Sequence, residues 1–166
     1  KWRVDSNSTK KMKAAIDIGT NTVLLLVAEI TETGLKVVHE EQRMPRLGKG
    51  VDLNKTLSIN SIHRVVSSLK EYKNILETQY NDVSEIVVTA TSAVRDASNK
   101  NEFISTIKKE TGFDVQLLSG EEEAQCTFEG AMSVLGNESE GDVFVLDIGG
   151  GSTEIALGRN GELIDS

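Results

Sequence analysis

Two aspartates, each at the end of an apolar run and each followed by isoleucine and glycine, are the residues best suited to chemistry. Asp17 begins Asp-Ile-Gly-Thr-Asn-Thr, and Asp147, 130 positions later, begins Asp-Ile-Gly-Gly-Gly-Ser-Thr-Glu. An apolar run interrupted by glycine and small polar residues predicts a strand, a tight turn and a second strand. The backbone N–H groups of such a turn can bind phosphate while the aspartate faces a metal-bound anion. Two facing turns would hold a polyphosphate from both sides, which points to phosphoryl transfer.

The second turn, Gly149-Gly150-Gly151-Ser152, has no bulky side chain to keep an anion away from its backbone N–H groups. An ordinary tight turn is the alternative interpretation. Asp147 and Glu154 on the two arms of the hairpin, together with the matching Asp17, favour phosphate binding. Neither copy is a Rossmann or Walker loop, because no Gly-x-Gly-x-x-Gly opens a helix and Gly48-Lys49-Gly50 lacks the Ser/Thr that follows the lysine of a P-loop.

Asp147 and Glu154 are also candidate metal ligands, since their carboxylates can converge near the turn. Magnesium takes one or two protein carboxylates and leaves its other positions to phosphate oxygens and water. The first copy has Leu24 where the second has Glu154, so we expect the metal at the second turn with Asp17 assisting. A solvated glutamate on an edge strand is the alternative for Glu154.

Two further charged groups could take part. The acidic run 121–123 begins a predicted helix, where the helix dipole alone would explain it, and periodicity does not choose among its three glutamates. Arg95 follows a predicted strand, where a guanidinium could bind phosphate through two hydrogen bonds. The alternative is a surface arginine beside Asp96.

The elements that must position these residues follow from the hydrophobic pattern. Strands are expected near 14–18, 22–30, 35–42, 86–91, 113–118, 143–148 and 153–158, helices near 58–79, 100–111 and 121–135, and a loop over 43–54. This βββαβαβα order predicts an α/β fold, a mixed sheet with helices packed on it. The repeat adds the opening hairpin of a second, similar domain. We therefore expect a tail at 1–11, a first domain at 12–135 and the truncated start of a second at 136–166.

Composition limits the class of protein. The chain of 166 residues has 18 basic and 26 acidic residues and a net charge of −8, which argues against a nucleic-acid binder. Its single cysteine, Cys126, excludes a disulfide framework and a cysteine metal cluster. No apolar run approaches the roughly 18 residues of a membrane span, and residues 1–11 lack the apolar stretch of a secretory signal. We expect a cytoplasmic protein.

Four segments resemble, in order and spacing, the exopolyphosphatase and guanosine pentaphosphate phosphohydrolase (Ppx/GppA) family. They are 17–22, 91–95, 119–124 and 147–154, and the resemblance runs from about Met12 to Ser166. The paired Asp-Ile-Gly turns are similar to those of the wider actin, sugar-kinase and heat-shock-chaperone superfamily, which implies a ribonuclease-H-like fold. The later glycine-serine-glycine-threonine phosphate loop of the family is not in this sequence.

The resemblance implies hydrolysis of the terminal phosphoanhydride of inorganic polyphosphate, or of a guanosine penta- or tetraphosphate such as pppGpp. It implies Mg²⁺ or another divalent cation at Asp147 and Glu154, and a cleft between this part and a missing C-terminal domain. It selects Glu123 as the base that activates water, with Glu122 as an auxiliary. The phosphate-binding residues it implies are Asp17, Gly19, Thr20, Asn21, Thr22, Arg95, Gly149, Gly150, Gly151 and Ser152.

Two other classes stay open. One is a non-catalytic domain that binds polyphosphate or alarmone nucleotides, and the other is an ATP-dependent member of the superfamily, such as a kinase. A water-activating Glu123 argues against both, because neither needs such a base. The sequence does not choose between polyphosphate and pppGpp, and it leaves the oligomeric state open, a homodimer included.

Overall fold

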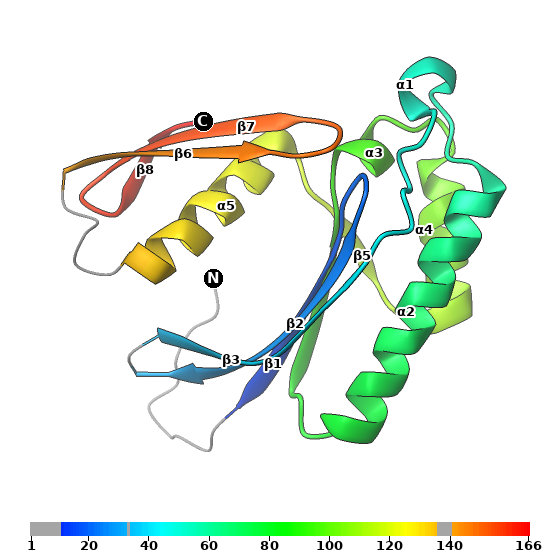
Figure 1. The fold of residues 1–166 in the computed structure, drawn as a ribbon, viewed down its shortest axis with the longest axis horizontal. Coiled ribbons are helices and arrows are strands. Elements are labelled where there is room, and N and C mark those ends of the chain that lie inside the picture. The colour runs from blue at the N-terminus through cyan, green and yellow to red at the C-terminus, as the bar shows by residue number, and fades with distance from the viewer. Residues whose placement is uncertain (1–10, 33, 136–140) are drawn as a thin grey trace.

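The computed structural model describes residues 11–32, 34–135 and 141–166, and it contains two β-sheets and five helices in that part of the chain (Figure 1). Residues 1–10 of the expected tail lie outside the described residues. The elements are β1 Met12–Ile18, β2 Val23–Thr31, β3 Gly34–Arg43, α1 Val51–Asn54, α2 Ile59–Gln79, β4 Glu85–Ala90, α3 Ser92–Arg95, α4 Lys100–Thr111, β5 Val115–Leu117, α5 Gly120–Leu135, β6 Asp142–Ile148, β7 Thr153–Arg159 and β8 Glu162–Asp165.

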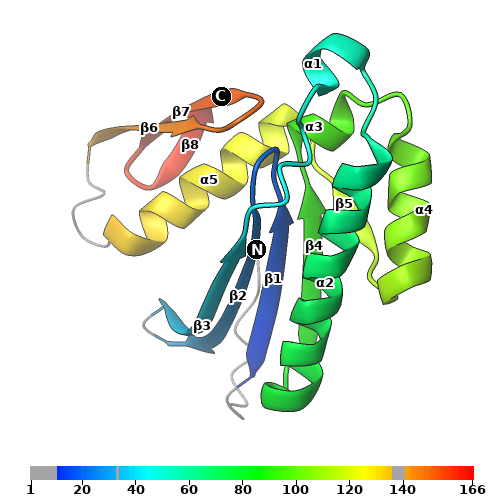
Figure 2. The same cartoon turned by 45° about the vertical axis from the view of Figure 1, so that its right-hand side comes forward.

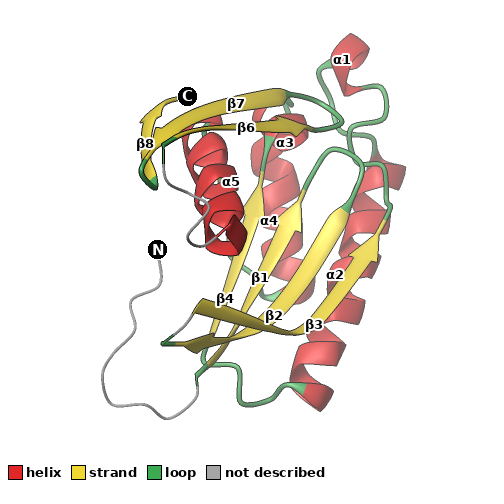
Figure 3. Ribbon diagram, turned by 60° about the vertical axis from the view of Figure 1, so that its left-hand side comes forward, coloured by secondary structure: helices red, strands yellow, loops and turns green. Residues whose placement is uncertain are grey.

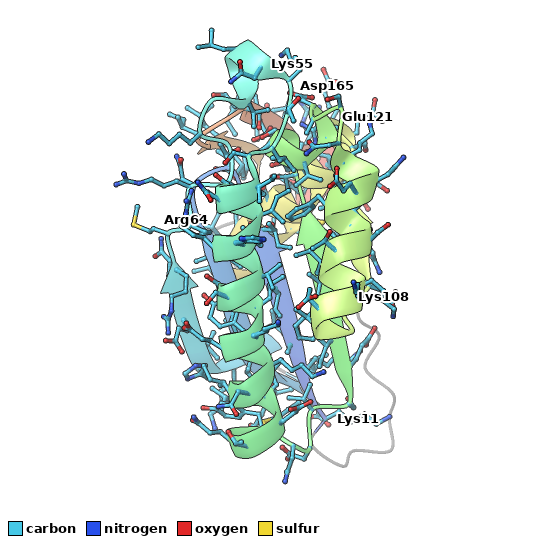
Figure 4. The ribbon with its side chains drawn as sticks, turned by 90° about the vertical axis from the view of Figure 1, so that its right-hand side faces the viewer. Lys11, Lys55, Arg64, Lys108, Glu121 and Asp165 are labelled. Atoms are coloured by element: carbon cyan, nitrogen blue, oxygen red, sulfur yellow. The ribbon has the colours of Figure 1, made fainter. Side chains whose placement is uncertain are left out.

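The first sheet has five strands in the order β3-β2-β1-β4-β5. β1 pairs antiparallel with β2 and parallel with β4, which makes the sheet mixed as expected. Alternate residues of β1 and β2, such as Ile16 and Leu25, are fully buried on the face covered by α2 and α4. These two helices lie side by side on one face of the sheet, with their axes roughly along the strands (Figures 2 and 4). Because every second residue is buried, apolar residues alternate along these strands, and that pattern predicts the strands from the sequence.

The ends of the helices also follow local rules. The side chain of Ser58 accepts a hydrogen bond from Ser61 N and caps the start of α2, close to where the helix was expected to begin. Gly112, with a φ of 81°, ends α4 in the left-handed conformation that glycine adopts without strain. None of the described helices is long and apolar enough to cross a membrane.

The second sheet consists of β6, β7 and β8 in sequence order, all antiparallel. Helix α5 packs on one of its faces, where Phe128 lies against Gly158 (Figures 1 and 3). The opposite face carries exposed apolar side chains. They are Phe144, Leu146, Ile148 and Ile155, which are 58–74% exposed.

The two hairpins have the same construction, which confirms the predicted repeat. Asp17 pairs with Leu24 across the first hairpin, and Asp147 pairs with Glu154 across the second. Both turns are closed by the same hydrogen bond, from Gly19 N to Thr22 O at 2.9 Å and from Gly149 N to Ser152 O at 3.0 Å. The similarity extends further. A register shift lies between residues 27 and 28 and again at the equivalent 157 and 158.

Three features differ from the expectations. α1 and α3 are single helical turns, and α1 lies in the predicted loop 43–54. α1 is bounded by left-handed residues at Gly50 and Lys55, and Val51 is buried, so packing rather than periodicity forms it. α5, expected within the first domain, packs on the second sheet instead. The division at residue 135 stays a prediction, and these contacts favour a boundary before α5.

Candidate active site

A cleft lies where the turns of the two hairpins meet. In the ribbon the turn between β6 and β7 approaches the turn between β1 and β2, close to α3 (Figures 1 and 3). The cavity there has a volume of about 370 Å³. Its lining residues are Asp17, Gly19, Thr20, Asn21, Thr22, Leu24, Thr91, Ser92, Glu123, Asp147, Ile148, Gly149, Gly150, Ser152 and Glu154.

The two turns are in direct contact, and this contact requires glycine in the second one. A Cβ atom on Gly150 would collide with the side chain of Asn21. A Cβ on Gly151 would lie 2.5 Å from Thr20 Oγ1 and 2.8 Å from Ser92 Oγ. The Thr20 and Ser92 hydroxyls are themselves 3.1 Å apart. The glycines therefore allow close approach of the loops as well as of an anion.

Acidic side chains converge on this cleft. Asp17, Glu123, Asp147 and Glu154 all line it, whereas none of its described lining residues is a lysine or arginine. Burial raises the pKa of Asp17, and the charge of Asp147 raises it further, while a hydrogen bond from Thr89 opposes the rise. The site therefore carries a concentration of negative charge that a bound cation would relieve.

Glu123 projects from the first turn of α5 and is held by Arg95. Arg95 Nη1 donates to Glu123 Oε2 at 3.1 Å and to the carbonyl of Leu118 at 2.9 Å. Burial raises the pKa of Glu123, and the charge of Glu154 adds to this, while the hydrogen bonds of Arg95 and Thr91 oppose it. A carboxylate with a raised pKa is a stronger base than an exposed glutamate once it is ionised.

Glu122, the neighbour of Glu123, does not reach the cleft. Its carboxylate accepts a hydrogen bond from Ser119 N at 2.8 Å, and its own N–H donates to Ser119 Oγ at 3.2 Å. This reciprocal pair is a capping box that stabilises the start of α5. The hydrogen bonds to Ser119 also lower the pKa of Glu122. The acidic run is thus divided between helix capping and the cleft.

The donor set fits a magnesium-type cation. Asp147 and Glu154 are direct partners across the hairpin, so their carboxylates lie on the same face of the sheet. No three Asp, Glu, His or Cys side chains of the described residues form a complete metal cage. One or two carboxylates with the remaining positions left to water and phosphate is the usual arrangement for Mg²⁺.

Most residues expected at the site are thus brought together, and two others adjoin it. Gly151 touches the first turn rather than lining the cavity, and Arg95 meets the cleft through Glu123. Sequence reasoning assigned no role to Thr91 and Ser92, although both line the cavity. They follow β4, which is parallel to β1, so their place at the same sheet edge as the first turn was a usable signal.

The comparisons with known proteins point to one family. The sequence pattern of the Ppx/GppA phosphatase family matches residues 26–166. Exopolyphosphatase 2 of Mycobacterium tuberculosis is 37% identical over 157 residues, which cover 89% of this chain and 48% of that protein. A bifunctional 3-dehydroquinate synthase/phosphatase of Fusobacterium nucleatum is 36% identical, over 94% of this chain and 24% of that protein.

Solved structures give the same result. An exopolyphosphatase from Cytophaga hutchinsonii superposes with a TM-score of 0.85 at 33% identity, over 93% of this chain and 48% of that one. The Aquifex aeolicus Ppx/GppA enzyme gives a TM-score of 0.82 at 33% identity, over 93% and 50%. The chain spans about half of each of these solved relatives.

The five-stranded mixed sheet, the antiparallel three-stranded sheet and the paired turns define a mixed α/β domain of the actin-like ATPase fold, as expected from the sequence. Within that fold, the chain belongs to the Ppx/GppA phosphatase family.

Proposed function

We propose that this chain forms part of a phosphohydrolase that removes the terminal phosphate from inorganic polyphosphate, from pppGpp, or from both. Family membership supports the substrate class, because its relatives include exopolyphosphatases and a guanosine-5'-triphosphate,3'-diphosphate pyrophosphatase of Pseudoalteromonas translucida. The observation that carries the reaction type is the partly buried carboxylate of Glu123, which faces the same cavity as both turns.

In this mechanism Glu123 accepts a proton from the attacking water. Arg95 binds Oε2 of Glu123 and so fixes the orientation of the carboxylate toward the cavity. The raised pKa of Glu123 favours proton uptake during attack. A positioned acceptor of this kind is what water attack at phosphorus requires.

The two turns hold the phosphates from opposite sides. Backbone N–H groups around Thr20 to Thr22 and around Gly150 to Ser152 would supply donors without bulky side chains. A divalent cation held by Asp147 and Glu154 would neutralise charge on the transferring phosphoryl group. Because none of the described residues that line the cavity is a lysine or arginine, such a cation would supply positive charge on this side of the cleft.

Complete activity is expected to require the longer protein. The carboxylates Asp17, Glu123 and Asp147 also border a second cavity of about 670 Å³ between the first sheet and α5. Solvent reaching the base from that side weakens electrostatic stabilisation in the cleft. The chain 1–166 alone is therefore expected to hydrolyse little, and full activity from it would contradict a cleft completed by a further domain.

The test measures phosphate release from polyphosphate and from pppGpp by the full-length protein and by its Glu123→Gln variant. Removing a general base costs ~10²–10⁴-fold in rate, so kcat should fall by that order while substrate affinity is largely retained. Glu122→Gln is the matched control, because glutamine also completes a capping box and should leave turnover nearly unchanged. If only Glu122→Gln lost activity, Glu122 would be the base. Substrate binding without phosphate release in the wild type would favour the non-catalytic binding domain.

A further inference from the structure

Each aspartate of the repeat accepts a hydrogen bond from a threonine hydroxyl of another element. Thr89 Oγ1, on β4, lies 3.2 Å from Asp17 Oδ1, and Thr127 Oγ1, on α5, lies 3.2 Å from Asp147 Oδ2. Both hydrogen bonds are partly buried. The two threonines do not occupy equivalent positions of the repeat. The same threonine-to-aspartate hydrogen bond therefore forms at both turns from different elements.

The placement of Thr127 links it to the base as well. Thr127 follows Glu123 by four residues on α5, so both side chains lie on the same face of that helix, about one turn apart. The next residue, Phe128, is buried against Gly158 of β7 and holds this face of the helix on the second sheet. One helix therefore carries the proton acceptor and the hydroxyl that contacts the candidate metal ligand.

A hydroxyl bound to one carboxylate oxygen restricts rotation of the carboxylate and leaves its second oxygen free. We propose that Thr127 is a positioning residue, whose hydroxyl holds Asp147 Oδ2 so that Oδ1 is presented to a divalent cation. This inference rests on the proposed function only in treating Asp147 as a metal ligand. Groups that orient a ligand in this way typically contribute 10–100-fold to metal affinity or activity.

The experiment compares Mn²⁺ binding by the full-length wild type and its Thr127→Val variant, followed by the electron paramagnetic resonance signal of free Mn²⁺. Mn²⁺ suits the same oxygen ligands as Mg²⁺. Valine keeps the shape of threonine and removes the hydroxyl, so the dissociation constant should rise about 10–100-fold. Thr127→Ser should restore binding to near the wild-type value. In a turnover assay, raising the metal concentration should recover most of kcat in Thr127→Val, because Glu123 is intact.

Thr106→Val is the matched control, since Thr106 also lies on a helix and its hydroxyl donates to the Glu102 carbonyl of its own helix, at 2.8 Å. It should bind Mn²⁺ like the wild type. If Thr127→Val melts well below Thr106→Val, Thr127→Ala replaces it with the same expectation, because alanine favours a helix.

Equal Mn²⁺ affinity in the wild type and Thr127→Val, or no Mn²⁺ binding by the wild type, would overturn the inference. Failure of this inference can be distinguished from failure of the proposed function. Weakened Mn²⁺ binding in Thr127→Val with no phosphate release by the wild type would support Thr127 and contradict the hydrolase. Normal phosphate release by the wild type with unchanged Mn²⁺ binding in Thr127→Val would support the hydrolase and contradict the role of Thr127.

Discussion

The hairpins β1–β2 and β6–β7 share register, turn and register shift, yet their surroundings differ. β1 lies in the middle of the five-stranded sheet, between β2 and β4, and one face of it is buried in the core. β6 is an edge strand of the three-stranded sheet, and one face of that sheet is exposed. Both turns line the cleft, but the strands of the first hairpin also form part of the core, whereas the strands of the second leave one face of their sheet exposed.

Two pairs of equivalent residues show where the copies diverge. Leu24 stands opposite Asp17, whereas Glu154 stands opposite Asp147. Ala28 in β2 corresponds to Gly158 in β7, where the ring of Phe128 occupies the space that a Cβ would fill. The two copies thus share the turn and differ in single residues beside it, which under the proposed function would direct the metal to the second copy.

The largest effect, on metal affinity, should come from giving Asp147 the same partner across its hairpin that Asp17 has. In the full-length protein, Glu154→Leu makes the second hairpin like the first and removes one of two expected metal ligands. Mn²⁺ affinity should fall at least tenfold, since even indirect partners of a ligand contribute about that much.

Leu24→Glu is the mirror variant, and it should weaken polyphosphate binding because it adds negative charge beside Asp17. Unchanged Mn²⁺ affinity in Glu154→Leu would place the metal elsewhere.

A smaller effect, on thermal stability, is expected from the second pair, Ala28 and Gly158. Gly158→Ala gives β7 the residue of β2, but the new methyl group would collide with the ring of Phe128 and lie 2.9 Å from the carbonyl of Glu162. Such overpacking costs ~1–3 kcal/mol, which thermal denaturation would register as a fall of several degrees in Tm. Gly130→Ala on α5 is the control, because a Cβ there meets nothing within 4 Å. Equal Tm values for the two variants would show that α5 does not hold the second sheet in this way.

The smallest effect concerns Asp17, whose pKa is raised by burial and by Asp147. A carboxyl with a raised pKa favours the folded state when protonated, so its contribution is lost as pH rises through that pKa. Asp17→Asn keeps an acceptor for Thr89 and removes the charge. In the absence of divalent cations its Tm at pH 7 should exceed that of the wild type by a few degrees, since ~1 kcal/mol moves Tm by about 2–4 °C.

This gain for Asp17→Asn should shrink as pH falls toward ~4, near the ordinary pKa of aspartate, because the wild-type carboxyl then becomes neutral. A lower Tm than the wild type at pH 7 would show that the charge of Asp17 is compensated in the folded state.

The sequence was sufficient for features that depend on neighbours along the chain. The two hairpins, the Ser58 cap and the Gly112 stop follow from patterns within a few residues. The pairing of Arg95 with Glu123 spans 28 positions and that of Thr127 with Asp147 spans 20, so only the folded chain reveals them. The glutamates 121–123 show the same limit, because their pattern is uniform and their separation into capping and cleft residues depends on tertiary contacts.

The exposed face of β6, β7 and β8 has a practical consequence for handling the chain 1–166. Phe144, Leu146, Ile148 and Ile155 form an apolar surface on a sheet, and such surfaces drive self-association in water. Purified preparations of this chain should scatter light increasingly with concentration and should enhance the fluorescence of an apolar dye. Colloidal behaviour, rather than unfolding, will set the concentration at which this chain can be studied alone.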